Sequence, residues 1–394
     1  MIFQQHKLTT TNHLSHASIR SAKKTMLYLN HQWAVPRSMS IDGMLCYGGG
    51  TGVGLNLARK SFGEYYERDH FFNAVPVHQR GLIEQLVNPE LWEKYTDFIR
   101  QLSAKTFRPQ PLDFTQVINF KTQEPELFFY NGISLKSNPL DIALFPYSDS
   151  CACAVHNNLQ ASLASSLLEF IERQAFLGSW LSQQINYQIK PEVLFELTPY
   201  TQLISDLLDN GELYIFNNGL AIPGHSVVMF YFAHHKADRV QYSIGASAGF
   251  NIQDALISAF EELWQCYAFL YNITTTKALE EKAGSSYHMQ FLQYNQRSTK
   301  EVIPYFNSCR SHAALMDIKE LRTQPVFSLQ SMLAELISQG ESLLYYHHHD
   351  QKLGLHFTKI VSPDYFAHMA LDKPLNINNQ YMEESNYFQL CSYT

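Results

Sequence analysis

The chain has 394 residues, a formal net charge of −7 and 16% charged side chains, against roughly 25% in an average soluble domain. Its 26 Phe, 23 Tyr and 4 Trp argue against disorder and indicate that part of its surface is covered by another molecule. The negative charge argues against a nucleic acid as partner, because sequence-independent binding to that backbone requires a basic patch.

The beginning of the chain and its apolar runs bear on location. The first twenty residues are too polar for the core of a secretion signal. The longest apolar run, 227–233, is far too short to cross a membrane. The six cysteines lack the dense spacing of a small secreted protein. We therefore expect a cytoplasmic protein with reduced thiols and no attachment to a membrane.

The N-terminal part is predicted to contain an extension and then a glycine-rich turn. Residues 1–40 are polar and show no period, so they are expected to precede one large domain at 41–394. The glycine run at 48–54 lacks the lysine–serine pair of a phosphate-binding loop, which favours a flexible turn. A helix is expected at 55–72, directly after this run.

Two strongly periodic helices follow, separated by short segments typical of strands. Apolar residues recur every four positions from Leu159 to Ile171, and a broad apolar stripe runs from Ala255 to Tyr267. No linker rich in proline, glycine or serine divides the chain. The pattern predicts a mixed α/β fold, a single domain with helices packed on β-sheet. Strands are expected at 127–130, 213–216, 227–232, 241–244 and 356–361.

A short motif occurs twice in the chain. Each copy reads Glu-x-x-Glu-Arg, and on a helix its three charged side chains share one face. The third helix adds Ser258, Glu261, Glu262 and Gln265 opposite its apolar stripe. The residues of the two copies are Glu64, Glu67 and Arg68, and Glu169, Glu172 and Arg173.

Two interpretations of this repeat remain open. Each copy alone would suit a solvated helix face whose Glu–Arg pairs contribute a few tenths of a kcal/mol. However, the neighbouring Tyr65, Tyr66, Phe170 and Ile171 are not typical of an exposed face. If the helices converge, four carboxylates would require a neutralising cation. Such oxygen ligands suit Mg²⁺ together with the phosphates of a nucleotide.

The same residues carry a resemblance to a known family. In this order and spacing, the two Glu-x-x-Glu-Arg copies and Glu262-x-x-Gln265 resemble the three ATP-binding motifs of YcaO-domain proteins. The segments 63–73, 151–153, 262–265 and 359–369 are further similar to the cyclodehydratase subunit of thiazole/oxazole-modified microcin synthetases. The resemblance extends from about residue 40 to the C-terminus.

The resemblance implies ATP- and Mg²⁺-dependent cyclisation of a ribosomal precursor peptide. A Cys, Ser or sometimes Thr side chain attacks the preceding amide carbon, ATP phosphorylates the resulting oxyanion, and phosphate leaves as the azoline ring closes. The protein then positions ATP and stabilises charge. By analogy, Glu64, Glu67, Glu169 and Glu172 would hold metal, and Arg68, Asn157, Arg173, Glu262 and Gln265 would contact or organise the nucleotide; no catalytic base is assigned.

The resemblance also implies partners, and the chain departs from the family pattern at three places. The expected partners are the precursor peptide, a subunit that binds its leader, and an FMN-dependent dehydrogenase that oxidises azolines. Lys60 stands where the family often has Ser, and Ala161 where it commonly has an acidic ligand. The last residues, 389–394, lack the family's proline-rich ending.

Several alternatives and weaker signals accompany this hypothesis. The same fold could form a thioamide or an amidine, or the chain could be a non-catalytic scaffold that binds peptide and partners. Cys151 and Cys153, with His156, could bind zinc or act as nucleophiles, but structural thiols are favoured because no further ligand has zinc-site spacing. His347–His349 are expected at a strand end, facing solvent.

Overall fold

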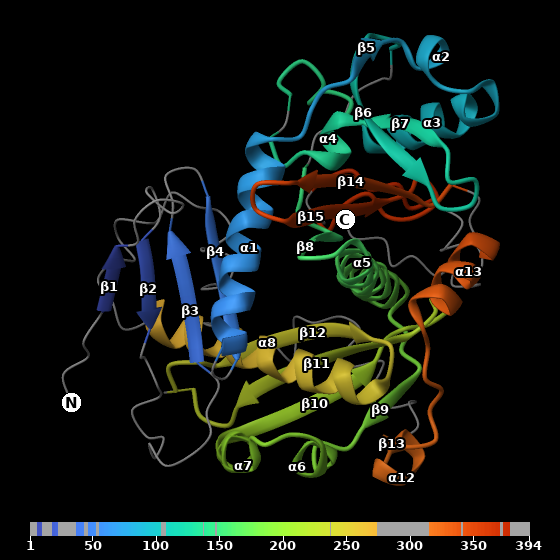
Figure 1. Ribbon diagram of the computed structural model, residues 1–394. Helices are drawn as coiled ribbons and strands as arrows, with labels where there is room; N and C mark the ends of the chain where they lie inside the picture. The colour runs from blue at the N-terminus through green and yellow to red at the C-terminus, as the bar shows by residue number, and fades with distance from the viewer. Residues whose placement is uncertain are drawn as a thin grey trace.

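The computed structural model describes residues 6–9, 18–22, 37–42, 46–52, 55–103, 108–136, 138–145, 148–236, 238–273, 315–339, 342–370 and 373–378. These residues form three β-sheets with helices packed between and around them (Figure 1). The mixed α/β class predicted from the sequence is confirmed. The following paragraphs concern these ranges.

The first sheet is an antiparallel array in chain order. Its strands are β1 (His6–Thr9), β2 (Ser18–Ala22), β3 (Arg37–Asp42) and β4 (Tyr47–Gly52). Helix α1 (Leu55–Asn73) follows β4 and packs on it and on β8 of another sheet. Residue 41, the expected start of the large domain, lies inside β3.

The glycine run forms strand β4, so the predicted flexible turn is wrong for the described residues 48–52. This strand pairs with β3, from Asp42 opposite Tyr47 to Arg37 opposite Gly52. A Cβ on Gly48 would lie 2.3 Å from the backbone nitrogen of Tyr65 in α1. The glycines are therefore needed because strand backbone lies directly against helix backbone.

The second sheet has the strand order β12-β11-β10-β9-β13. Its two faces carry different apolar clusters, because successive side chains of a strand alternate. Leu213 and Ile215 face α8, whereas Tyr214 and Phe216 face α5. The strands are β9 (Tyr187–Ile189), β10 (Gly211–Asn217), β11 (His225–Ala233), β12 (Tyr242–Gly249) and β13 (Leu315–Met316); the helices α6 (Val193–Leu197), α7 (Thr201–Asn210) and α8 (Ile252–Ile273) belong to this part of the chain.

The third sheet has the order β5-β6-β14-β15-β8. Strand β7 is a further member that pairs with β6 and lies outside this order. Helix α5 (Leu159–Ser182) lies between this sheet and the second one and contacts both (Figure 1). The strands are β5 (Gln79–Gly81), β6 (Leu112–Asn119), β7 (Pro125–Phe129), β8 (Cys153–His156), β14 (Leu344–Asp350) and β15 (Leu355–Val361); the remaining helices are α2 (Ile83–Leu86), α3 (Pro89–Leu102), α4 (Tyr130–Ile133), α12 (Ile318–Leu321) and α13 (Leu329–Gln339).

An aromatic core fills the side of the third sheet that faces α1, α3 and α4. Tyr95, Phe114 and Phe128 are fully buried there, and ring pairs connect α3 to β7. Much of the unusual aromatic content is therefore internal packing. His347–His349 form the last part of β14, where His348 and His349 are exposed, as predicted.

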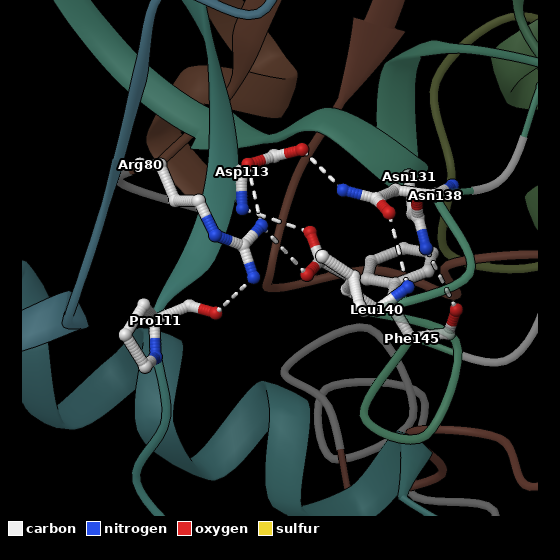
Figure 2. A network of polar contacts seen from close by, with 8 residues as sticks. Arg80, Pro111, Asp113, Asn131, Asn138, Leu140 and Phe145 are labelled. Atoms are coloured by element: carbon white, nitrogen blue, oxygen red, sulfur yellow. Dashed lines mark hydrogen bonds and ion pairs between the residues drawn. The ribbon is translucent and has the colours of Figure 1, made fainter.

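A polar network fixes the loop after α4 to β6 (Figure 2). The Arg80 guanidinium lies 2.6 Å from Asp113 Oδ1 and 3.3 Å from Asp141 Oδ1, and it also donates to the carbonyl of Pro111. The Asp141 carboxylate accepts the backbone N–H of Asp113 at 2.8 Å. The network anchors the segment that leads to residues 148–151, which border the site described next.

Candidate active site

Helix α1 carries the first Glu-x-x-Glu-Arg copy and fixes its first carboxylate tightly. Arg68 Nε and Nη2 donate to Glu64 Oε1 at 2.9 and 2.6 Å. The backbone N–H of Gly49 in β4 donates to Glu64 Oε2 at 2.6 Å. The glycine-rich strand therefore contributes a hydrogen-bond donor to the site as well as close packing.

Helix α5 carries the second copy, with a less complete set of contacts. Its N-terminus is capped by Asn158, whose side chain accepts the N–H of Ala161. Arg173 lies 3.6 Å from Glu169 Oε1 and 3.3 Å from Glu172 Oε1. Glu172 Oε1 and Arg173 Nε are both buried without a hydrogen-bond partner. These two atoms form the ion pair with each other but lack hydrogen-bond geometry, and at functional sites a ligand can complete such bonding.

Helix α8 brings the third motif to the same place. The Glu262 carboxylate accepts the N–H of Ala246 in β12 at 2.9 Å. A Cβ built on Gly49 would lie 3.6 Å from Glu64 Oε2 and 4.0 Å from Gln265 Nε2. Glu64 and Gln265 therefore approach the same point beside Gly49, which brings the first motif next to the third.

The glutamates raise one another's pKa values, which shows that the three helices place them together. Burial raises the pKa of Glu67 to about 8, and the charge of Glu64 adds to it. Burial also raises the pKa of Glu169 to about 8, with Arg173 opposing and Glu67 contributing. For Glu172 burial raises the pKa well above its usual range, and for Glu262 it raises the pKa as well.

The residues fit a divalent cation with a nucleotide, although they do not enclose a metal by themselves. Within the described ranges, no three acidic, histidine or cysteine side chains lie close enough together to hold a metal ion. Glu64 is occupied by Arg68 and Gly49. The carboxylates nonetheless offer hard oxygen donors, and Glu172 and Arg173 retain unsatisfied atoms. Phosphate oxygens from a nucleotide would supply the ligands that the protein lacks.

Asn157 stands apart from this charge network. Its side-chain oxygen contacts His156 Nδ1 at 2.9 Å and accepts from Asn158 at 3.2 Å. The side chain is exposed just before α5 begins. Its contacts therefore do not connect it to the carboxylates.

The two cysteines near the site are structural. Burial raises the pKa of both Cys151 and Cys153 well above the usual range for a thiol. Cys151 Sγ donates to Asp149 Oδ2 at 3.0 Å. Protonated thiols of this kind are poor nucleophiles and poor zinc ligands. This agrees with the structural role favoured from the sequence.

Lys359 and Asp149 belong to the site and were not assigned to it from the sequence. Lys359 is 3% exposed, and its Nζ donates to the carbonyl oxygen of Asp149 at 2.7 Å. Its charge lowers the pKa of both Glu67 and Glu169, against the effect of burial. The available signal was a lysine within an apolar strand pattern, between Phe357 and Val361.

The departures at Lys60 and Ala161 have local partners. Lys60 Nζ lies 2.5 Å from Glu261 Oε2, and Tyr200 donates to the other oxygen of that carboxylate at 2.8 Å. Lys60 thereby joins α1 to α8. Ala161 lies in the first turn of α5 and contributes only its N–H. The chain end at 389–394 lies outside the described residues.

Comparison with known proteins identifies the family. A family model described as YcaO cyclodehydratase, ATP- and Mg²⁺-binding, matches residues 50–365. The chain belongs to the YcaO cyclodehydratase family. It is therefore an enzyme of an ATP- and Mg²⁺-dependent family, and the three motifs lie within the matched range.

Individual YcaO relatives agree with this assignment. The Microcin B17-processing protein McbD of Escherichia coli is 26% identical over 346 residues, which cover 84% of each chain. A chain of the E. coli microcin synthetase McbBCD complex superposes with a TM-score of 0.82 at 25% identity, covering 97% of this chain and 95% of that one. YcaO from Methanopyrus kandleri, bound with AMPPCP and Mg²⁺, shares the fold with a TM-score of 0.59 at 12% identity, covering 94% and 88%.

One further observation concerns membranes. In the described ranges, every helix is either too short or too polar to serve as a membrane span.

Proposed function

We propose that this chain is the ATP-dependent cyclodehydratase subunit of a microcin-type synthetase. It would convert Cys and Ser, and in some positions Thr, of a ribosomal precursor peptide into thiazoline and oxazoline rings. The observation that supports this most is that three charged helix motifs come together around β4 and β8. The chain belongs to the YcaO cyclodehydratase family and resembles McbD along 84% of its length.

The metal and nucleotide ligands are proposed from the contacts at the site. Glu67, Glu169 and Glu172 line it from two helices, and Glu64 joins them when it exchanges its bond from Gly49 for a metal. Bound Mg²⁺ would neutralise the phosphates and the charge that develops on the transferred phosphoryl group. Arg68, Asn157, Arg173, Glu262 and Gln265 are proposed to contact or organise the nucleotide.

The chain's own residues mainly orient the reactants. Arg68 and Arg173 each lie beside a carboxylate on their own helix, and a planar guanidinium is the side chain best suited to bind phosphate oxygens. The substrate supplies the nucleophile, which is consistent with the protonated thiols of Cys151 and Cys153. This division suits a reaction in which positioning and charge stabilisation dominate.

The proposed partners follow from the assemblies of the relatives. The McbBCD complex is a heteromer, and one of its structures has pro-MccB17 bound. For this chain we propose a precursor peptide, a leader-binding subunit and an FMN-dependent azoline dehydrogenase as partners in the cytoplasm. We also retain the division into an extension at 1–40 and a catalytic domain at 41–394.

Mass spectrometry of the precursor tests this function. With ATP, Mg²⁺ and the partner subunits, the wild-type chain should remove one water per ring, whereas Glu67→Gln and Glu172→Gln should abolish both ring formation and coupled ATP hydrolysis. Glu335→Gln, an exposed position on α13, is the matched control and should keep full activity. Exchange of oxygen for sulfur would indicate thioamide formation instead, and full activity of both variants would refute the assigned site.

A further inference from the structure

Lys359 occupies a position where the strand pattern calls for an apolar residue. On β15, Phe357, Lys359 and Val361 point to the same face, and Phe357 and Val361 belong to the aromatic core beside α1. The side chain of Lys359 is 3% exposed. Burying an ammonium costs several kcal/mol when no carboxylate contacts it. A residue that breaks the local pattern at such a cost requires a functional reason.

The recorded contacts of Lys359 are neutral, which distinguishes it from Arg173 and Lys94. Its Nζ donates to the carbonyl oxygens of Asp149 at 2.7 Å and Ile133 at 3.5 Å, and the structure records no ion pair for it there. In contrast, Arg173 lies 3.3 Å from Glu172, and Lys94 lies 2.8 Å from Asp364. A cation that contacts a carboxylate is largely neutralised, whereas one held by carbonyls keeps its full charge.

This charge is directed at the site between the two motif helices. Lys359 pairs in register with Cys153 on β8, the strand beside which α1 and α5 both pack. Its charge acts on Glu67 from α1 and on Glu169 from α5. Lys359 and Arg173 also line the same small internal cavity, of about 20 Å³, with Cys151. Lys359 therefore lies close to Arg173 of the second motif.

The carbonyl contact also ties Lys359 to a turn that borders the site. Asp149 Oδ2 accepts the Cys151 thiol and the N–H of Met369, each at 3.0 Å, while its carbonyl accepts Lys359. The ammonium is thus held by a turn that two further hydrogen bonds fix in place.

We propose that Lys359 is a positioning residue of the active site, whose fixed positive charge admits an anionic nucleotide among the glutamates. The inference rests on the proposed function and deepens it. Once Glu67 and Glu169 are ionised to hold Mg²⁺, a nucleotide triphosphate that approaches them meets like charge, and Lys359 offsets that repulsion without contacting a carboxylate. The same charge weakens the binding of a bare divalent cation.

The proposal is tested by measuring the affinities for a nucleotide and for a bare divalent cation, which should change in opposite directions when the charge of Lys359 is removed. Lys359→Met removes the charge with little change of volume in an apolar surrounding. Isothermal titration with AMPPCP at saturating Mg²⁺ should show binding weakened on the order of tenfold, whereas Mn²⁺ alone, measured by electron paramagnetic resonance, should bind more tightly by a similar factor. The unfolding temperature should be no lower than that of the wild type. Lys359→Arg should restore both affinities to within a few-fold of the wild type.

Lys94→Met is the matched control, since it removes a lysine that pairs with the buried Asp364 and is not among the charges that act on Glu67 or Glu169. It should lower the unfolding temperature and leave both affinities unchanged. If Lys359→Met does not fold, Lys359→Gln carries the same two binding expectations. Parallel weakening of both ligands, or no change in either, would overturn the proposal. Failure of the Lys359 proposal can be told apart from failure of the proposed function. In the second case the wild-type complex itself would form no rings.

Discussion

Glu67 and Glu169 make the site sensitive to pH, because burial raises the pKa of each to about 8 from an ordinary value of 4.5. Between these values the folded chain keeps protons that the unfolded chain has already released. The free energy of unfolding of the nucleotide-free protein should therefore fall as the pH rises from about 5 to about 8, and level off above. Thermal unfolding followed by circular dichroism at several pH values measures this slope.

Replacing one of these glutamates by glutamine removes its titrating carboxyl group. Glu169→Gln should flatten the slope and raise the unfolding temperature at pH 8, because a neutral side chain avoids the repulsion from Glu67 and Asp149. Glu335→Gln, exposed on α13, should leave the slope unchanged. A slope in Glu169→Gln equal to that of the wild type would contradict the account of these carboxylates.

The sequence motifs predicted which charged residues lie together on each helix, since spacing on a helix determines which side chains share a face. The contacts that α1, α5 and α8 make through β4 and β8 depend on packing between segments far apart in the chain. Lys359 could not be assigned to the site from the sequence, because its position also depends on packing between distant segments. Its place beside Glu67 results from the pairing of β15 with β8, which no local pattern specifies.

Strand β4 and helix α1 form the element pair on which the first motif depends. Gly48→Ala would place a Cβ 2.3 Å from the backbone nitrogen of Tyr65, so strand and helix must separate. We expect a lower unfolding temperature and loss of nucleotide binding, because α1 would carry Glu64 and Glu67 away from the other two motifs. Thermal unfolding and titration with AMPPCP measure the two effects.

Gly63→Ala is the control within the same helix. A Cβ there would meet Val155 Cγ1 at 3.8 Å, an ordinary contact. Removing a glycine from a helix interior should stabilise the chain by about 0.5–1 kcal/mol. Equal losses in Gly48→Ala and Gly63→Ala would refute the role given to the close strand–helix contact.

The Arg80 network gives a second expectation at this scale (Figure 2). Arg80→Met leaves the carboxylates of Asp113 and Asp141, which are 9% and 2% exposed, without their cation. We expect a loss of about 2 kcal/mol in the free energy of unfolding measured with urea, since Arg80 itself is partly exposed. Arg100→Met, which breaks an exposed pair with Asp97, should cost less than about 0.5 kcal/mol. Equal costs would contradict the network's role.

Helices were easier to predict than the glycine strand, for a physical reason. The apolar periods of α5 and α8 are local and match the faces that the structure buries. The glycines of β4 indicated a turn, because a run without side chains has no period. Only the proximity of α1 explains why they form a strand.

At the scale of the whole molecule, α5 separates two sheets, and the motif helices α1 and α8 both contact β4 (Figure 1). The sequence predicted the mixed α/β class and the main helices, but neither the three sheets nor their order. Those depend on pairings such as β13 with β9 and β14 with β6, between segments distant in sequence.

The proposed partners lead to an expectation about assembly. The chain expressed alone should show little cyclisation, and full activity should require co-purification in a complex larger than its own 45.4 kDa. Light scattering coupled to size-exclusion chromatography measures the mass. A fully active monomer without any partner would show that the partner proposal is wrong.

Transfer of the amide oxygen tests the central claim most directly. A precursor peptide is labelled with heavy oxygen in the amide carbonyl before a Cys or Ser, and incubated with the complex, ATP and Mg²⁺ in ordinary water. If the chain is an ATP-dependent cyclodehydratase that phosphorylates the amide oxygen, the label should appear in inorganic phosphate, one labelled phosphate for each ring. Rings accompanied by unlabelled phosphate, with the heavy oxygen released as water, would contradict the account.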